Sequence, residues 1–135
     1  MNQKELVKNG FILAALMNFS VLLFSRGFTN TAINEADPVV MSNFGLLMIV
    51  MWGLAYLSAT TISSNIKWLA GVFAIEKLIY GVVWLNWQLE NSLEAVYSTD
   101  LFAGVFYSIY GLNDLFFMAF FAWVFFTCKP DDEAV

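Results

Sequence analysis

Apolar residues fill four long blocks of the chain, and polar or charged residues gather in the short segments between them. A helix needs about 20 apolar residues to cross the hydrocarbon layer of a bilayer, which is about 30 Å thick. The blocks predict transmembrane helices at about residues 7–28, 39–60, 66–87 and 101–127. The predicted fold is therefore all-α, with residues 1–135 forming a single integral membrane domain, a four-helix bundle.

The segments between the blocks carry turn and capping signals. Asp37 followed by Pro38 ends the first outer loop, residues 29–37, and predicts the N-cap and first turn of the second helix. The polar residues 61–65 predict a tight hairpin at the inner side. The second outer connection, residues 88–100, includes a predicted surface turn of helix at about residues 92–97.

The first block has a short apolar centre, residues 11–24, preceded by two lysines, and so also resembles a signal peptide. We expect a retained helix, because no clean small-x-small cleavage site follows it. The acidic residues near the other end of the chain are interpreted as a solubilising tail: Asp131, Asp132 and Glu133.

The basic residues predict the orientation, because loops rich in Lys and Arg stay in the cytoplasm. One predicted side carries Arg26 alone, and the other carries four lysines: Lys4, Lys8, Lys67 and Lys129. Both termini are therefore expected in the cytoplasm. Tryptophans near both predicted interfaces support the same spans, with Trp68 and Trp123 at the inner side and Trp84 and Trp87 at the outer side.

Composition excludes several classes of protein. The chain is 60% hydrophobic and only 13% charged, well outside the range of soluble globular domains. It has no histidine and one cysteine, Cys128, which rules out intramolecular disulfides and His-ligated metal or haem sites. Its net charge of −5 argues against nucleic-acid binding. We expect a lipid bilayer as its surroundings and no cofactor or metal site.

Three ionisable residues are predicted at mid-membrane depth. Glu76 lies about 15 Å from the inner end of the third helix, and Asp114 lies about 20 Å from either end of the fourth. Lys77 follows Glu76 directly. A charge at the bilayer centre costs about 2.5 to 3.5 kcal/mol on insertion scales, so such residues are candidates for function.

A Lys77–Asp114 ion pair would neutralise two of these charges and leave Glu76 as a protonatable carboxyl. Helical spacing puts aromatic residues on the same stripes. The predicted ligand or ion core therefore comprises the three charged residues, two asparagines at similar depth and four aromatic residues: Glu76, Lys77, Asp114, Asn113, Asn18, Tyr80, Tyr107, Tyr110 and Trp84.

Four interpretations of this core stay open. The Lys77–Asp114 pair could simply hold two helices together, since helices in lipid associate through packing and hydrogen bonds. It could instead belong to a ligand site, to a proton or ion path, or to a contact with another subunit. No catalytic residues are assigned. Tyr56 and Trp52 are interpreted as packing residues.

Three short motifs resemble the DoxX-like group of small four-helix proteins of the bacterial inner membrane. They are Gly53-Leu-Ala-Tyr56, Glu76-Lys77 and Asn113-Asp114-Leu115-Phe116. The resemblance implies a multi-pass protein of that membrane, with Lys77 and Asp114 as the pair of interest. Most members of the group have no assigned function, and a few resemble membrane subunits of oxidoreductases that work near quinone. Glu76 stands where the group is expected to have a small residue.

The leading hypothesis is a non-enzymatic membrane protein, acting as a homo-oligomer, that binds a small or lipophilic ligand or moves a proton or solute. The alternative is an accessory or anchoring subunit of a larger membrane complex, in which the charged pair is structural. A third hypothesis is catalysis on a sterol-like or quinone substrate, with Glu76 and Asp114 as acid and base. It ranks last, because no nucleophile or metal set accompanies these carboxyls.

Overall fold

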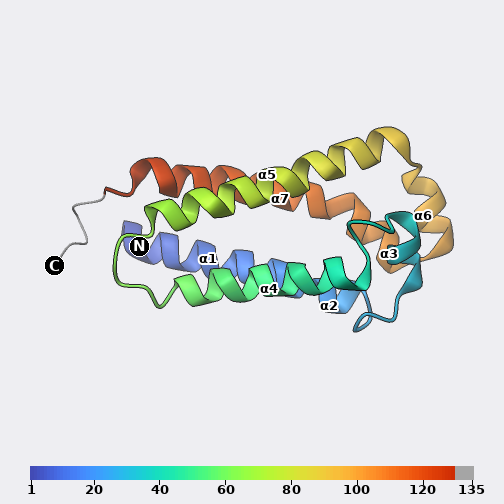
Figure 1. The fold of residues 1–135 in the computed structure, drawn as a ribbon, viewed down its shortest axis with the longest axis horizontal. Coiled ribbons are helices and arrows are strands. Elements are labelled where there is room, and N and C mark those ends of the chain that lie inside the picture. Colours follow the sequence, from blue (N-terminus) through green and yellow to red (C-terminus); the bar gives the residue numbers. More distant parts are fainter. Residues whose placement is uncertain (130–135) are drawn as a thin grey trace.

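A computed structural model describes residues 1–129, and all regular secondary structure in that range is helical, which confirms the predicted all-α class. Four long helices run side by side, and two short helices lie across the end that is remote from the N-terminus (Figure 1). The elements are α1 (Gln3–Phe19), α2 (Val21–Phe24), α3 (Thr31–Ala36), α4 (Asn43–Ala59), α5 (Lys67–Glu90), α6 (Leu93–Thr99) and α7 (Leu101–Thr127).

Three helical segments are long and apolar enough to cross a membrane: Gln3–Phe24, which joins α1 and α2, Lys67–Glu90 and Leu101–Thr127. The remaining long helix, α4, is also apolar but has 17 residues. Large apolar side chains stay exposed along these helices, for example Leu16, Phe44, Ile75 and Phe116. An apolar surface of this extent suits lipid rather than water, which indicates a membrane protein.

The long helices associate as two pairs. α1 packs along α4, and α5 packs along α7, whereas α1 and α2 touch α7 more sparsely. Buried aromatic side chains form two apolar clusters at different depths. One surrounds Phe73 and Phe121 towards the N-terminal end, and the other surrounds Trp87 and Tyr107 towards the short helices. Polar side chains lie between the two clusters.

Glycines allow the closest approaches within each pair. A Cβ atom at Gly53 of α4 would lie 2.7 Å from the Phe19 ring and 3.1 Å from the Cβ atom of Asn18 on α1. A Cβ atom at Gly111 of α7 would lie 1.9 Å from the Trp84 ring on α5. Any larger residue at these positions would push the paired helices apart, so the glycines set the depth at which polar side chains meet.

The prediction that Asp37 caps the second long helix is wrong. α4 begins at Asn43, and Ser42 is its N-cap, with the Ser42 hydroxyl accepting from the Gly45 N–H at 3.1 Å. The Asp37 carboxylate instead accepts from the Val40 N–H, within a turn that follows α3. This turn places Met41 in the core, fully buried, and so delays the start of the helix.

Other boundaries also differ from the sequence expectations. α1 starts at Gln3, ahead of residue 7, because Asn2 and Glu5 form a reciprocal capping box. The outer loop predicted at residues 29–37 contains α3, whose N-cap is the Asn30 side chain. The predicted acidic tail lies outside the described residues.

Candidate functional site

Each of the four long helices contributes to one connected cluster of buried polar side chains. Asn18 comes from α1, Tyr56 from α4, Glu76 and Lys77 from α5, and Asp114 from α7. All five are buried, with Lys77 at 1% exposure and Glu76 and Asp114 at 6% each. We refer to these five residues as the buried polar layer.

Lys77 is the centre of the layer. Its Nζ atom lies 2.7 Å from Asp114 Oδ1, which is the ion pair predicted from the sequence, and 2.9 Å from Asn18 Oδ1. The same atom lies 5.3 Å from the centre of the Tyr56 ring, a cation–π distance. One ammonium group therefore contacts side chains from the three other long helices.

Asn18 connects this ammonium to the neighbouring helix backbone. Its side-chain nitrogen donates to the Ile49 carbonyl of α4 at 2.9 Å, while its oxygen accepts from Lys77. The amide is thereby oriented by partners at both ends. Asn18 links α1, α4 and α5 at one depth, which the sequence predicted only as a similar depth to the charged residues.

Glu76 has a partner that the sequence reasoning missed. The Tyr56 hydroxyl donates to a carboxylate oxygen of Glu76, so Tyr56 does more than pack, whereas Glu76 stays outside the Lys77–Asp114 ion pair as expected. Two signals could have found this contact: a fully buried tyrosine usually needs a hydrogen-bond partner, and Tyr56 ends the Gly53-Leu-Ala-Tyr56 motif. Trp52 does pack edge-on against Phe73, with ring centres 6.2 Å apart.

A small cavity of about 40 Å³ adjoins the layer. Its polar lining comes from Asn18 and Ser20 on one helix pair and from residues of α5 and α7 on the other: Glu76, Lys77, Tyr80, Tyr110, Asn113 and Asp114. A water molecule needs roughly 10 to 15 Å³ of such space, so the cavity has room for about three. It is far below the roughly 300 to 1,000 Å³ of a typical small-molecule pocket.

Tyr110 is the polar group of this cavity that lacks a partner. Its hydroxyl is buried and makes no hydrogen bond among the residues that the structure describes, and the whole side chain is 7% exposed. A buried hydroxyl without a partner costs about 1 to 3 kcal/mol. The arrangement is suited to a small polar species that could accept or donate a hydrogen bond there.

Seven of the nine residues of the predicted core line this cavity, and Tyr107 and Trp84 do not, although the Tyr107 ring centre lies 5.8 Å from that of Tyr110. The Tyr107 hydroxyl donates to the Ile33 carbonyl at 2.7 Å, and the Tyr107 carbonyl accepts from Trp84 Nε1, also at 2.7 Å. These two residues therefore fasten α3 and α5 to α7. Helical stripes give a shared face but not a shared depth, so residues on one stripe need not line one cavity.

The charges of the layer do not balance. Glu76 and Asp114 supply two carboxyl groups, and Lys77 supplies one ammonium group. With all three ionised, the layer would hold one net negative charge in surroundings where an uncompensated charge is costly. One proton or one small monovalent cation would restore neutrality.

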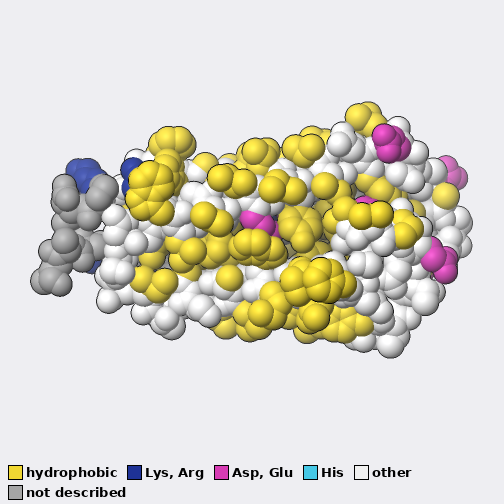
Figure 2. Space-filling model, in the orientation of Figure 1, with side chains coloured by type: hydrophobic (Ala, Val, Ile, Leu, Met, Phe, Trp, Pro, Cys, Tyr) yellow, Lys and Arg dark blue, Asp and Glu magenta, His cyan; other side chains and the backbone are white. Residues whose placement is uncertain are grey.

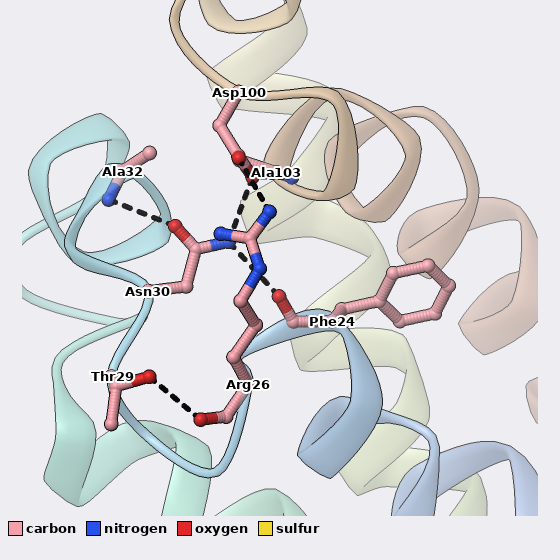
Figure 3. Close-up of polar contacts among 7 residues, drawn as sticks. All are labelled: Phe24, Arg26, Thr29, Asn30, Ala32, Asp100 and Ala103. Carbon is pink, nitrogen blue, oxygen red and sulfur yellow. Dashed lines mark hydrogen bonds and ion pairs between the residues drawn. The ribbon is translucent and has the colours of Figure 1, made fainter.

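A second polar cluster lies at the end that carries the short helices. Arg26 Nη2 lies 2.9 Å from Asp100 Oδ1, and the Asn30 side chain donates to both Asp100 and the Phe24 carbonyl (Figure 3). We refer to Arg26, Asn30 and Asp100 as the outer clasp. It joins the end of α2 to the first turn of α7, where Asp100 also accepts from the Ala103 N–H.

The backbone of the outer clasp is unusual. Arg26, Gly27 and Phe28 have φ angles of 48°, 64° and 67°, so three consecutive residues are left-handed. Non-glycine residues rarely adopt this conformation, and surrounding contacts must hold it. The hydrogen bond from Ala103 and then that from Asn30, together with Arg26, lower the pKa of Asp100 to about 2 from its ordinary 3.8.

Comparisons with protein families, with curated proteins and with solved structures find no match for this chain. The resemblance to the DoxX-like group stays a prediction that rests on the three short motifs.

Proposed function

We propose that the chain is a four-span protein of the bacterial inner membrane, with both ends in the cytoplasm, whose buried polar layer takes up and releases a proton. One observation carries the proposal: two buried carboxyl groups and a single ammonium group border a cavity of about 40 Å³ that is also lined by Tyr110, whose hydroxyl has no partner among the described residues. A site that needs one positive charge for neutrality, next to space for water, suits reversible protonation.

Glu76 is the proposed proton carrier. Asp114 is held by the Lys77 ammonium, whereas Glu76 is held by the neutral hydroxyl of Tyr56. The cation therefore favours the ionised form of Asp114 more directly, and the exchangeable proton belongs on Glu76. Water in the adjoining cavity would connect that carboxyl to Tyr80 and Tyr110, which line the same space.

The size of the cavity favours a proton or a hydrated small ion over a lipophilic ligand. About 40 Å³ cannot enclose a sterol or a quinone, which removes the support for lipophilic ligand binding at the buried polar layer. Access is favoured along the seam between the helix pairs, where contacts are sparse and the half-exposed Ser20 and the exposed Ile109 line the cavity. Since one chain encloses so little space beside this layer, we propose a homo-oligomer as the working form.

The alternative is an accessory subunit in which the layer only joins helices. The hydrogen bonds of Lys77 support this alternative. Its ammonium group donates to both Asp114 and Asn18, as expected of a contact that only joins helices. The two functions differ at Glu76. A structural layer would tolerate a neutral isostere there, whereas proton transfer would not.

The test is proton flux into liposomes that contain the purified full chain and a pH-sensitive dye, with a potassium diffusion potential as the driving force. We expect flux above that of protein-free liposomes, and we expect Glu76→Gln to lower it about 100-fold, the scale of a lost proton-transfer group. The matched control is Glu94→Gln, because Glu94 is an exposed carboxylate on α6. Thermal unfolding of each variant checks that the fold is intact.

Two results would count against proton transfer. One is a wild-type flux no higher than that of empty liposomes. The other is a folded Glu76→Gln variant with unchanged flux, which would favour the accessory role.

A further inference from the structure

A second and much larger cavity opens at the end of the molecule that holds the N-terminus. It has a volume of about 390 Å³ and lies between the start of α1, the connection from α4 to α5 and the end of α7. This volume is within the roughly 300 to 1,000 Å³ of ligand sites. We refer to it as the basic-end groove, defined by an apolar floor of Val7, Ile62 and Ile66, none of which is fully buried, and a rim of Lys4, Lys8 and Lys129.

The protein core lies directly beneath this floor. Phe11, Ala59 and Val124 also line the groove, but they are only 1%, 3% and 1% exposed and belong to the apolar cluster around Phe73 and Phe121. The more accessible side chains of Val7, Ile62 and Ile66 therefore supply the apolar surface that a ligand could cover.

Within residues 1–129, no carboxylate offsets the positive charge of the rim. Lys4 and Lys8 lie one helical turn apart on α1, so they share a face, and Lys129 follows the end of α7. No carboxylate lines the groove, and none within residues 1–129 lies within 4.0 Å of these three ammonium groups. Hydroxyl groups of Ser63 and Thr127 complete the polar part of the opening.

Charge along the whole molecule distinguishes this end from the other. Figure 2 shows Lys and Arg side chains near the N-terminal end and most of the visible Asp and Glu side chains at the opposite end, with a mainly apolar surface between them. A ligand for the groove must therefore combine a negative group, for the rim, with an apolar part, for the floor. Both parts must meet near the interface between membrane and cytoplasm.

We propose that the basic-end groove binds an anionic phospholipid of the surrounding membrane, with its phosphate among Lys4, Lys8 and Lys129 and one apolar tail against Val7, Ile62 and Ile66. The inference uses the membrane placement proposed above and is independent of proton transfer at the buried polar layer. Loss of lipid binding and loss of proton flux are separate measurements.

Lys67 provides a matched control at the same end. Its Nζ atom lies 4.8 Å from the centre of the Phe125 ring, and the residue does not line the groove. Neutralising Lys67 changes the charge of this end by one unit without changing the rim. If anionic lipid is attracted by the overall charge of the basic end, neutralising Lys67 should weaken lipid binding. If the lipid binds in the groove, neutralising Lys67 should leave lipid binding unchanged.

The test is lipid titration of the full chain in neutral detergent, followed by native mass spectrometry, with phosphatidylglycerol, phosphatidylcholine and inorganic phosphate as probes. We expect retention of phosphatidylglycerol alone. Near a membrane surface each lysine is worth about 1 kcal/mol, so Lys4→Gln, Lys8→Gln and Lys129→Gln together should weaken binding about 100-fold. Lys67→Gln should leave binding unchanged, and unchanged thermal unfolding of the triple variant confirms its fold.

Several outcomes would overturn the proposal. Equal retention of phosphatidylcholine would show that the charge of the lipid does not matter. Equal retention of inorganic phosphate would show that the apolar floor does not contribute to binding. If Lys67→Gln weakened phosphatidylglycerol binding as much as the triple variant does, the lipid would be attracted by the overall positive charge of this end and not by the groove. Binding that occurs only after Asp131→Asn, Asp132→Asn and Glu133→Gln would assign the groove to the chain's own acidic tail.

Discussion

Lys77 illustrates how a single buried residue can organise this chain. Its ammonium group meets a carboxylate from α7 and an amide from α1, and it lies over an aromatic ring from α4. Removing one partner of a buried ion pair leaves the other without compensation, which is more damaging than removing both. The layer therefore behaves as a unit, and its members should be tested together.

We expect Lys77→Met to lower the free energy of unfolding by about 3 to 5 kcal/mol, because Asp114 would keep a buried charge without a partner. Adding Asp114→Leu should restore much of that loss. Denaturant unfolding in detergent micelles would measure both values. The explanation requires that the second substitution raise the free energy of unfolding again. A double variant less stable than Lys77→Met would show that the pair stabilises the fold beyond mutual neutralisation.

Tyr107 and Tyr110 offer a matched comparison of two buried hydroxyl groups on the same helix. The Tyr107 hydroxyl donates to the Ile33 carbonyl, whereas the Tyr110 hydroxyl has no partner within the described residues. Tyr107→Phe should lower stability by about 1 kcal/mol, the usual worth of a hydrogen bond. Tyr110→Phe should not lower it, but should reduce proton flux. Equal loss of stability in both variants would contradict this assignment.

The sequence predicts part of the layer and misses part of it, for identifiable reasons. The cost of burying charge in lipid marks Glu76, Lys77 and Asp114 without any structure. Tyr56 escapes the same argument because a tyrosine is tolerated in apolar surroundings until its hydroxyl needs a partner. Tyr107 does not line the cavity, because seven residues of helix separate it from Asp114 by about 10 Å along the axis.

At the scale of the elements, the outer clasp joins α2 to α7 and holds a backbone that would otherwise be unfavourable. Its charged members sit at the predicted outer side, where Arg26 is the one basic residue among several acidic ones. The sequence predicts the turn region but not α3, because six-residue helices depend on caps such as Asn30 rather than on apolar periodicity. Asp37 does not cap α4, because its carboxylate accepts instead from the Val40 N–H of the local turn.

The pH dependence of the clasp follows from Asp100. Its pKa falls from 3.8 to about 2 on folding, so the folded state binds the proton less tightly than the unfolded state. The resulting stabilisation is present above pH 3.8 and is lost as the pH falls through about 2. We therefore expect the difference in Tm between wild type and Asp100→Asn to be constant above pH 4 and to shrink between pH 4 and 2.

Glu90→Gln is a suitable control for that measurement, since Glu90 is exposed at the same end and forms no ion pair with the described residues. The difference in Tm between wild type and Glu90→Gln should not show the same decrease between pH 4 and 2. A difference between wild type and Asp100→Asn that persists unchanged to pH 2 would contradict the role of Asp100.

At the scale of the whole molecule, the separation of charge predicts orientation. In the described chain, one end carries Lys4, Lys8, Lys67 and Lys129 with one carboxylate, Glu5, and the other carries Glu35, Asp37, Glu90, Glu94 and Asp100 with one basic residue, Arg26. Helix periodicity and charge bias are read directly from the sequence, so the helical class could be predicted. The pairing of α1 with α4 and of α5 with α7 depends on glycine contacts that no sequence pattern specifies.

Cysteine labelling would test the orientation. In a Cys128→Ser background, Ser98→Cys on exposed α6 should react with a membrane-impermeant maleimide in intact spheroplasts. Thr61→Cys, in the exposed connection at the opposite end, should react only after the membrane is permeabilised. The reverse pattern would show that the protein has the opposite orientation in the membrane. Labelling of both positions in intact cells would exclude the proposed topology.

The shortness of α4 has a consequence for the bilayer itself. Its 17 residues extend about 26 Å, less than a hydrocarbon layer of about 30 Å, whereas α5 and α7 have 24 and 27 residues. A short span is accommodated by local thinning, and a long one by tilt. The membrane should therefore be thinner beside α4 than beside α7, so that lipids with shorter hydrocarbon chains gather along one side of the protein and longer ones along the other.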